Sequence, residues 1–472
     1  MEQIHKSYPL EKLFAIIAVL AGLLMIMIEP PISGPDERVH FLNTYAVSTG
    51  QLIPKADNGV MVKEFPQNVV TFVEQHSAQF SGGQLEEKAD FRDWYYDSWL
   101  PIAETEPVEI TYWGIDSHAA GYIISGLGMM LFRILFLFLS PGLITTYNLI
   151  MAGKMANMFF YVLVCYFAIR ITPNYKRLFF VLALMPMSIY QAASLNYDAI
   201  LIPVCFLLFA FVLRVVRDED YRISGQDICL VMAITFFLAG IKQVYLCLLL
   251  SLFGIPVERF KDKRQYIRCI LLVLTTAAVT YGIHEFAMGP LDVVSTAEAA
   301  KMSEQLRYLI AHPFSIFTAI KNSLINYRGF YAISFVGVLG NLDINIPVYF
   351  HLLFWMVLAI VLIADSVHCS LTRKLKVLFA GGSILGVITS FLGIYLQWTS
   401  IMQGIGVDFV DGVQGRYFIP LTPFFLAIFA VKSLPNIKCW DSIQETVDGI
   451  TMASGIASAC VTVTVLILRF WI

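Results

Sequence analysis

The stretch LFAIIAVLAGLLMIMI, residues 13–28, decides the fold class of this protein. It contains no charged residue and runs directly into Glu29-Pro30-Pro31. It lacks the small-x-small pattern at which a signal peptide is cleaved, so we expect the stretch to remain in the mature chain. An apolar run of this length that ends at two prolines predicts a first membrane-spanning helix over residues 13–29.

The composition of the whole chain agrees with a membrane protein. Of 472 residues, 58% are hydrophobic and 14% are charged, whereas a soluble domain averages about 25% charged residues. The net charge of −3 and the lack of a long lysine or arginine run argue against a nucleic-acid partner. Eight cysteines occur without a CxxC or His/Cys pattern, which argues against a disulfide framework and a zinc site.

Ten further segments have the apolarity of membrane spans, although two of them are short. The sequence therefore predicts an all-α polytopic membrane protein with about eleven transmembrane helices. We expect a single helical membrane domain over residues 1–472, because no internal repeat or separate soluble domain is evident. The ten segments are 147–169, 177–194, 198–214, 227–241, 243–257, 267–288, 347–364, 376–396, 416–432 and 449–470.

The distribution of lysine and arginine between the short loops orients the chain. Five basic loop clusters fall on the cytoplasmic side if the N-terminus is cytoplasmic and the apolar segment 119–139 does not cross. The opposite short loops then keep almost no cation beyond Lys242 and Arg416. Segment 119–139 also contains Arg133. We therefore predict that it is a re-entrant or membrane-lying helix.

This topology places two large loops on the extracytoplasmic face. Residues 30–146 form the first loop, which we expect to carry juxtamembrane helices, and residues 289–346 form the second. The first loop begins with Gly34-Pro35 and then Asp36-Glu37-Arg38-Val39-His40.

The segment from Asp36 to His40 is the first candidate site. If it is helical, Asp36 and His40 lie four residues apart on one face, with Glu37 beside them. Two carboxylates and an imidazole can deprotonate a hydroxyl or bind a divalent cation. The alternative is that Asp36 only caps the helix and that Glu37 only favours its dipole.

Four more candidates lie on the same predicted face. Asp198 opens a span, either as an N-cap or as a functional acid. Lys242 lies between two apolar runs, where an ionisable group is often functional, although it can also extend harmlessly to the surface. Arg416 follows Gly415 and can hold a phosphate with two hydrogen bonds or simply reach the headgroups. Arg328 is a weaker candidate of the same kind.

Several motifs together resemble an uncharacterised family of bacterial polytopic membrane proteins, domain of unknown function 2142. The motifs run in order from about residue 33 to residue 423, which is nearly the whole chain. They are Pro35-Asp36-Glu37 with His40, Gln191-Ala192-Ala193-Ser194 with Asp198, Lys242 before a tyrosine, Phe335 to Asp343, and Val413 to Pro420.

That family is similar to the GT-C class of glycosyltransferases, and the resemblance implies a function. It implies a bacterial plasma-membrane enzyme that uses a polyprenyl-phosphate sugar donor and a glycan or glycolipid acceptor. Asp36 would be the base, with Glu37 and His40 as helpers or metal ligands. Asp198 would match a second acidic residue.

By the same resemblance, Lys242 and Arg416 would bind the donor phosphate, with Arg328 as the weaker candidate. A divalent cation is optional. One departure from the GT-C pattern matters, because Asp36 and Glu37 are adjacent, and adjacent helical residues point about 100° apart. Only one of them is then expected to face the acceptor.

Two other classes of function remain open. The chain can be a transporter or flippase for lipid-linked sugars, or a non-catalytic subunit of envelope polysaccharide assembly. A transporter is expected to carry ionisable groups within its spans or paired broken helices, and the sequence shows few.

Overall fold

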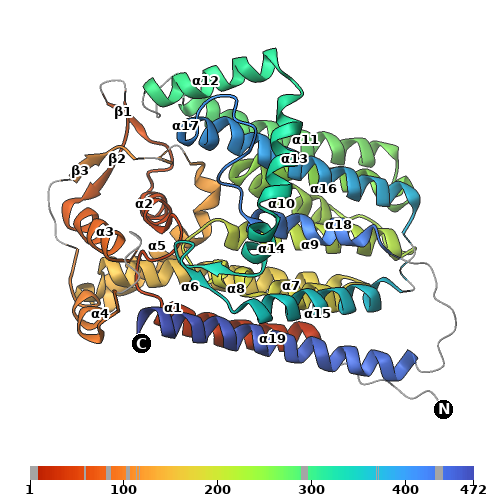
Figure 1. Cartoon of the computed structure of the whole chain (residues 1–472), viewed down its shortest axis with the longest axis horizontal. Helices are drawn as coiled ribbons and strands as arrows, with labels where there is room; N and C mark the ends of the chain where they lie inside the picture. Colours follow the sequence, from red (N-terminus) through yellow and green to blue (C-terminus); the bar gives the residue numbers. More distant parts are fainter. Residues whose placement is uncertain are drawn as a thin grey trace.

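Long parallel and antiparallel helices dominate the computed structural model of the chain (Figure 1). The structure describes residues 9–57, 60–80, 87–102, 107–112, 114–115, 117–288, 296–367, 369, 371–430 and 440–472. Within these residues, seven helices are long and apolar enough to cross a membrane. They belong to α1 (Leu10–Ile28), α6 (Thr146–Ile171), α9 (Asp198–Arg217), α11 (Lys263–Met288), α15 (Val348–Ser366), α16 (Arg373–Ile394) and α19 (Trp440–Phe470).

The bundle has two ends, which we name by one residue each. The Asp36 face is the end at which α1 ends and α9 begins, and the Arg177 face is the end at which α1 begins. Helix α9 lies at the centre of the bundle, and most of its side chains are buried on all sides. Because α9 begins at the Asp36 face in the middle of the bundle, its first residues are fixed by packing on every side.

The other four predicted spans are short or interrupted: segment 227–241 lies in a single α-helix of 17 residues, and the other three segments are irregular. Segment 177–194 forms two short helices, because Pro186 begins a new helix instead of continuing the first. Segment 243–257 is mostly 3₁₀-helical, and segment 416–432 is interrupted by Pro420 and Pro423. The elements are α7 (Lys176–Ala183), α8 (Pro186–Ala192), α10 (Gly225–Ile241), η3 (Gln243–Gly254), η6 (Gly415–Leu421) and α18 (Thr422–Ala427), with the short turn η4 (Val257–Arg259) after η3.

These four segments nevertheless run between the two faces. The 3₁₀-helix η3 starts beside Lys242 on the Asp36 face and ends at Gly254, which packs against Leu375 in the first turn of α16. A 3₁₀-helix rises about 2.0 Å per residue, so twelve residues reach about 24 Å. After η6 and α18, the carbonyl of Ala430 accepts a hydrogen bond from Lys376, also in the first turn of α16.

The first predicted loop folds into a small layer of helices and strands on the Asp36 face (Figure 1). Its antiparallel three-stranded sheet has the order β1-β2-β3, and the sequence analysis predicted no strands here. Phe41, Phe65 and Tyr112 lie in its separate apolar core. The elements are α2 (Glu37–Ser48), β1 (Lys55–Asp57), β2 (Val60–Pro66), α3 (Gln67–Phe80), α4 (Phe91–Asp97) and β3 (Pro107–Ile110).

The predicted membrane-lying segment 119–139 forms η1 (Ala119–Gly121) and α5 (Ile123–Leu139), followed by η2 (Pro141–Leu143). Helix α5 packs antiparallel to the first half of α6, where Gly128 allows it to approach Ala152 and Ala156 closely. Lys154 of α6 is level with the end of α1, since it pairs with Glu29. Helix α5 therefore packs mainly on the part of α6 that extends beyond α1.

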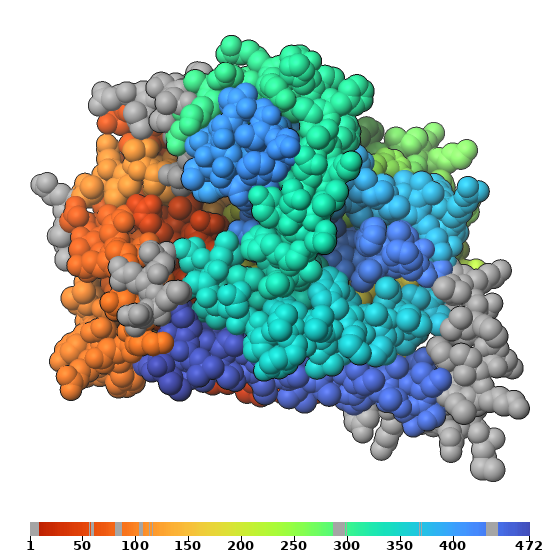
Figure 2. Space-filling view, viewed as in Figure 1, coloured from red at the N-terminus to blue at the C-terminus, as the bar shows by residue number. Residues whose placement is uncertain are grey.

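The second predicted loop forms helices that lie across one side of the bundle (Figure 2). Its first residues, 289–295, lie outside the described part of the chain. Asn322 and Ser323 hold the loop 403–414, since Asn322 donates to the Asp408 carbonyl at 2.9 Å and Ser323 Oγ accepts from Val410 N at 2.7 Å. The elements of the second predicted loop are α12 (Thr296–Ala311), α13 (Ser315–Asn326), α14 (Arg328–Val336), β4 (Val338–Leu339) and β5 (Ile344–Asn345). The loop 403–414 follows the π-helical η5 (Tyr395–Thr399) and α17 (Ser400–Met402).

Candidate functional site

Asp36 ends a strained turn, and its carboxylate makes no hydrogen bond or ion pair with the residues that the structure describes. It has φ 55° and ψ 15°, a left-handed conformation that aspartate tolerates better than most residues. The residue is exposed, and its side chain makes no capping hydrogen bond to α2. The capping interpretation of Asp36 is therefore wrong, and its carboxylate is available for another role.

Glu37 lies in a different environment from Asp36. Its side chain is buried, and Oε1 lies 2.9 Å from the ammonium of Lys154. The same oxygen accepts from Leu195 N at 3.1 Å, and Oε2 accepts from Gly34 N at 3.2 Å. Both oxygens of Glu37 are occupied inside the protein, so the adjacent carboxylates do point to different places.

His40 lies one turn into α2, between two tyrosines. Its Nδ1 is hydrogen-bonded to Tyr122 Oη at 3.1 Å, and its ring meets the ring of Tyr197 edge-on at 5.0 Å. Burial lowers the pKa of His40 to about 4, although the nearby charge of Asp36 opposes that shift. His40 is thus neutral at physiological pH.

Asp198 and Arg416 face each other from distant parts of the sequence. Asn196, not Asp198, caps the first turn of α9, because its Oδ1 accepts from Ala199 N at 3.1 Å. Asp198 Oδ2 is instead 3.9 Å from Arg416 Nε, and both side chains are about nine-tenths buried. Arg416 Nε has no hydrogen-bond partner, so the guanidinium retains the capacity to bind a ligand.

Gly415 allows Arg416 to reach this position. A Cβ at residue 415 would lie 2.1 Å from the carbonyl oxygen of Tyr331, so only glycine fits against α14. The backbone N–H of Gly415 also donates to Ser334 Oγ at 2.8 Å. The chain before Arg416 is therefore fixed by α14.

Lys242 joins the same cluster through aromatic rings. It links α10 to η3, and its ammonium lies 3.8 Å from the ring centre of Tyr417 and 5.6 Å from that of Tyr197. Among the contacts of the described residues, none pairs Lys242 with a carboxylate. A cation held on aromatic rings without an acidic partner is suited to an anionic ligand.

The structure thus brings together five of the seven predicted residues, and Glu37 lies directly behind them. The charges of Asp36 and Asp198 act on both His40 and Arg416. Arg328 is different, because it is exposed at the start of α14 and donates to the Ile325 carbonyl at 3.1 Å. No contact that the structure describes joins Arg328 to the cluster.

The sequence analysis gave Asp36, Glu37 and His40 as optional metal ligands, and their arrangement in the structure does not fit a metal ion. In the described ranges, no group of three or more His, Cys, Asp or Glu side chains is placed to hold one. The oxygens of Glu37 are bound to Lys154 and to backbone N–H groups, and His40 bonds Tyr122. Asp36, Glu37 and His40 therefore do not form one ligand set.

Sequence reasoning missed the residues behind the cluster. Lys154 binds Glu29 Oε2 at 2.9 Å in addition to Glu37, and Tyr190 donates to the other oxygen of Glu29. The signal was present in the sequence, because Lys154 interrupts the apolar run 147–169, and an ionisable residue inside a span marks a partner or a function.

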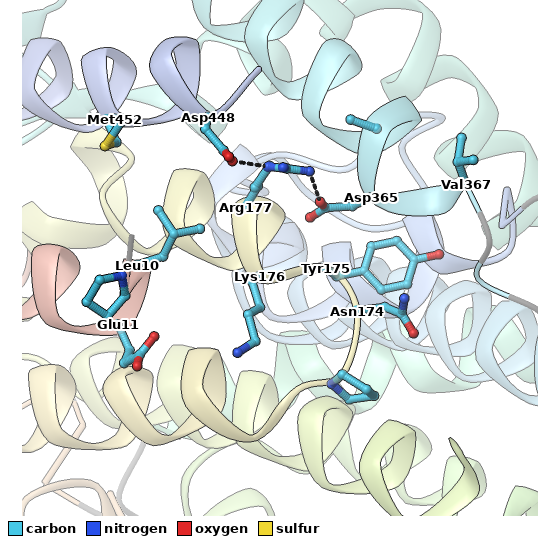
Figure 3. Close-up of a pocket in the computed structure, with 13 residues that line it drawn as sticks. Leu10, Glu11, Asn174, Tyr175, Lys176, Arg177, Asp365, Val367, Asp448 and Met452 are labelled. Atoms are coloured by element: carbon cyan, nitrogen blue, oxygen red, sulfur yellow. Dashed lines mark hydrogen bonds and ion pairs between the residues drawn. The ribbon is translucent and has the colours of Figure 1, made fainter. Parts of the chain in front are cut away.

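A separate polar pocket of about 410 Å³ lies at the Arg177 face (Figure 3). There, Arg177 bridges Asp448 at 2.6 Å and Asp365 at 3.3 Å. These contacts join α7, α15 and α19, and the one arginine charge is paired with two carboxylates. The pocket is at the opposite end of the bundle from Asp36, so it is not part of the candidate site.

Comparison with known proteins gives a family. Over residues 19–425 the chain matches the family model described as predicted membrane protein (DUF2142). No curated protein and no solved structure matches the chain at a significant level. The matched range covers most of the chain and contains every candidate residue of the site. This chain, a multi-pass membrane protein, therefore belongs to the DUF2142 family.

Proposed function

We propose that this protein is a glycosyltransferase that moves a sugar from a polyprenyl-phosphate donor to a hydroxyl of a cell-envelope glycan or glycolipid. The Asp36 face would lie on the extracytoplasmic side of a bacterial plasma membrane, with eleven spans in all. The observation that carries the proposal is the free carboxylate of Asp36 beside two cations, Arg416 and Lys242, at one end of the bundle.

In the proposed reaction, the carboxylate acts on the acceptor and the two cations act on the donor phosphate. Asp36 accepts the proton of the acceptor hydroxyl while the acceptor oxygen bonds to the anomeric carbon. The bond from that carbon to the phosphate oxygen breaks, and the lipid phosphate leaves with the electron pair. Lys242 and Arg416 stabilise the charge that develops on the phosphate.

Two neighbours support these tasks. Asp198 lies against Arg416 Nε and orients the guanidinium, so its other nitrogens can face a phosphate. His40 is neutral and packs against Tyr122 and Tyr197, so it adds no charge to the site at physiological pH. The ring of Tyr197, which is only partly buried, also offers an apolar surface to a sugar.

The proposal is tested with purified protein in proteoliposomes and a set of polyprenyl-phosphate sugars. We expect transfer to an acceptor glycolipid, and we expect Asp36→Asn to abolish it without loss of the folded protein. Transfer at the wild-type rate by Asp36→Asn would contradict the proposal.

A transporter or flippase for lipid-linked sugars is the second candidate. The buried ion network around Lys154 and the break between α7 and α8 favour it, because transporters often carry buried charges and interrupted helices. Two results together would replace the first candidate with this one. Lys242→Ala would stop translocation of a lipid-linked sugar, and neither the wild type nor any variant would transfer sugar to an acceptor.

A further inference from the structure

The turn that presents Asp36 is strained at two places. Ile32 has φ 62° and Asp36 has φ 55°, and a left-handed conformation is unfavourable for a β-branched residue such as isoleucine. Strain of this kind persists only where the surroundings enforce it. The turn, residues 29–37, therefore needs a restraint that holds its two ends.

Lys154 supplies that restraint. Its ammonium lies 2.9 Å from Glu29 Oε2 at the start of the turn and 2.9 Å from Glu37 Oε1 at the end. Lys154 is 0% exposed, and the two glutamates are at most 3% exposed. Without the ammonium, the two buried carboxylates would repel each other and push the ends of the turn apart.

The same cluster reaches the second acidic residue of the site. Glu37 Oε1 also accepts from Leu195 N, in the turn that leads to Asp198. Lys154 thus fixes Glu37, and Glu37 fixes both the turn before α2 and the turn before α9. None of the three charged groups needs to touch a substrate to have this effect.

We propose that Lys154 is a positioning residue that clasps Glu29 and Glu37 and thereby holds Asp36 and Asp198 in register with Arg416. The inference rests on the proposed function for the role of Asp36. We call the contacts of Lys154 with Glu29 and Glu37 the clasp, and the clasp concerns only the conformation of the turn. It is therefore measurable without any sugar transfer.

The test is hydrogen exchange of the full-length purified protein, measured by mass spectrometry. Lys154→Met removes the ammonium but keeps a flexible apolar stem. We expect the amides of Gly34 and Leu195, both bonded to Glu37, to exchange about tenfold faster or more. Arg170→Met, which removes an exposed cation from the same helix, is the matched control and is expected to change neither amide.

A triple variant separates the effect of Lys154 on the conformation of the turn from its effect on the stability of the whole protein. Glu29→Gln, Lys154→Met and Glu37→Gln together remove the buried charges, so the thermal stability is expected to return towards that of the wild type. The clasp is still missing, so exchange stays fast. We expect kcat to be about 100-fold lower than in the wild type, because Asp36 and Asp198 are no longer held in register with Arg416.

Each outcome decides something. Native exchange in a folded Lys154→Met protein, or native exchange and kcat in the triple variant, would overturn the clasp. If Lys154→Met cannot be purified, the triple variant decides alone. If the exchange responds as expected but the wild type transfers no sugar, the clasp stands and the proposed function fails.

Discussion

At the scale of single residues, two adjacent carboxylates have opposite environments. Asp36 is exposed and free of capping contacts, whereas Glu37 is buried against Lys154. The sequence predicted that only one of the pair faces the site, because adjacent helical residues diverge. Only the family resemblance favoured Asp36 over Glu37, since the partner of Glu37 lies more than one hundred residues away in the sequence.

The first prediction follows from this difference. Asp36→Asn is expected to lower sugar transfer by about 100-fold or more and to remove the acidic limb of the pH–rate profile, because the base is gone. Glu37→Gln is expected to keep that limb, since it alters only a contact inside the protein. The measurement is kcat/KM in proteoliposomes across pH. The reverse pattern would make Glu37 the base.

The second prediction concerns the cations. Arg416→Gln and Lys242→Gln are each expected to weaken the binding of a short-chain polyprenyl phosphate by about tenfold to 100-fold, the value of a hydrogen bond to a charged group. Arg328→Gln is the control and is expected to bind normally, because Arg328 is exposed and makes no described contact with the cluster. Equal losses in all three variants would show that the cluster is not the phosphate site.

At the scale of elements, the length of each apolar run was enough to locate the predicted spans. It did not predict which of them are broken or form a 3₁₀-helix. Segment 177–194 breaks at Pro186, and a proline within a run is visible in the sequence. The 3₁₀ form of η3 was not predictable, because it depends on close packing against Gly382 of α16, where a Cβ would lie 2.9 Å from the Cys247 carbonyl oxygen. The strands β1 to β3 were missed because β1 and β3 have only three and four residues and the sheet forms away from the bundle.

The third prediction concerns the docking of α2. His40 has a folded-state pKa of about 4, below its ordinary value near 6.5, because burial disfavours the charged ring. The unfolded state therefore binds more protons between these values. The contribution of His40 to stability is complete above pH 6.5 and is lost as the pH falls towards 4, by about 1.4 kcal/mol per pH unit.

Thermal unfolding of the wild type and of His40→Gln across that window measures the effect. Glutamine does not titrate, so we expect its curve to be flatter between pH 6.5 and pH 4. If stability falls with pH equally in the wild type and in His40→Gln, the interpretation of His40 as a neutral, buried residue is wrong. Helix α2 carries Glu37 as well, so the protection factors of the α2 amides, which correct for the intrinsic slowing of exchange in acid, are expected to fall with pH in the wild type only.

At the scale of the whole molecule, the topology derived from the distribution of lysine and arginine was enough to predict which residues of the candidate site lie at the same end of the bundle. Asp36, Asp198, Lys242 and Arg416 each border a predicted span on one predicted side, and the structure places all four at one end of the bundle. What the topology could not supply was the interior support. Lys154 acts through a contact between α1, α2 and α6, and one sequence does not reveal which helices are neighbours.

The last prediction tests the orientation of the bundle in the membrane. Gly142 follows α5 on the Asp36 face, and Gly225 begins α10 on the Arg177 face. An added Cβ at either residue meets no atom within 4 Å, so a cysteine fits at both. In a background with the exposed Cys229 and Cys460, and with Cys439 outside the described residues, all changed to serine, we expect an impermeant maleimide to label Gly142→Cys from outside intact cells.

Gly225→Cys is expected to react only after the cells are permeabilised, because five basic clusters predict that its face is cytoplasmic. These two results together would show that helix α5, which packs closely against Ala152 and Ala156 of α6, does not cross the membrane. Labelling of Gly142→Cys only from the cytoplasm would place the Asp36 face inside the cell. Transfer from a donor presented outside the cell would then be impossible at this site, and the proposed reaction would have to use a donor in the inner leaflet.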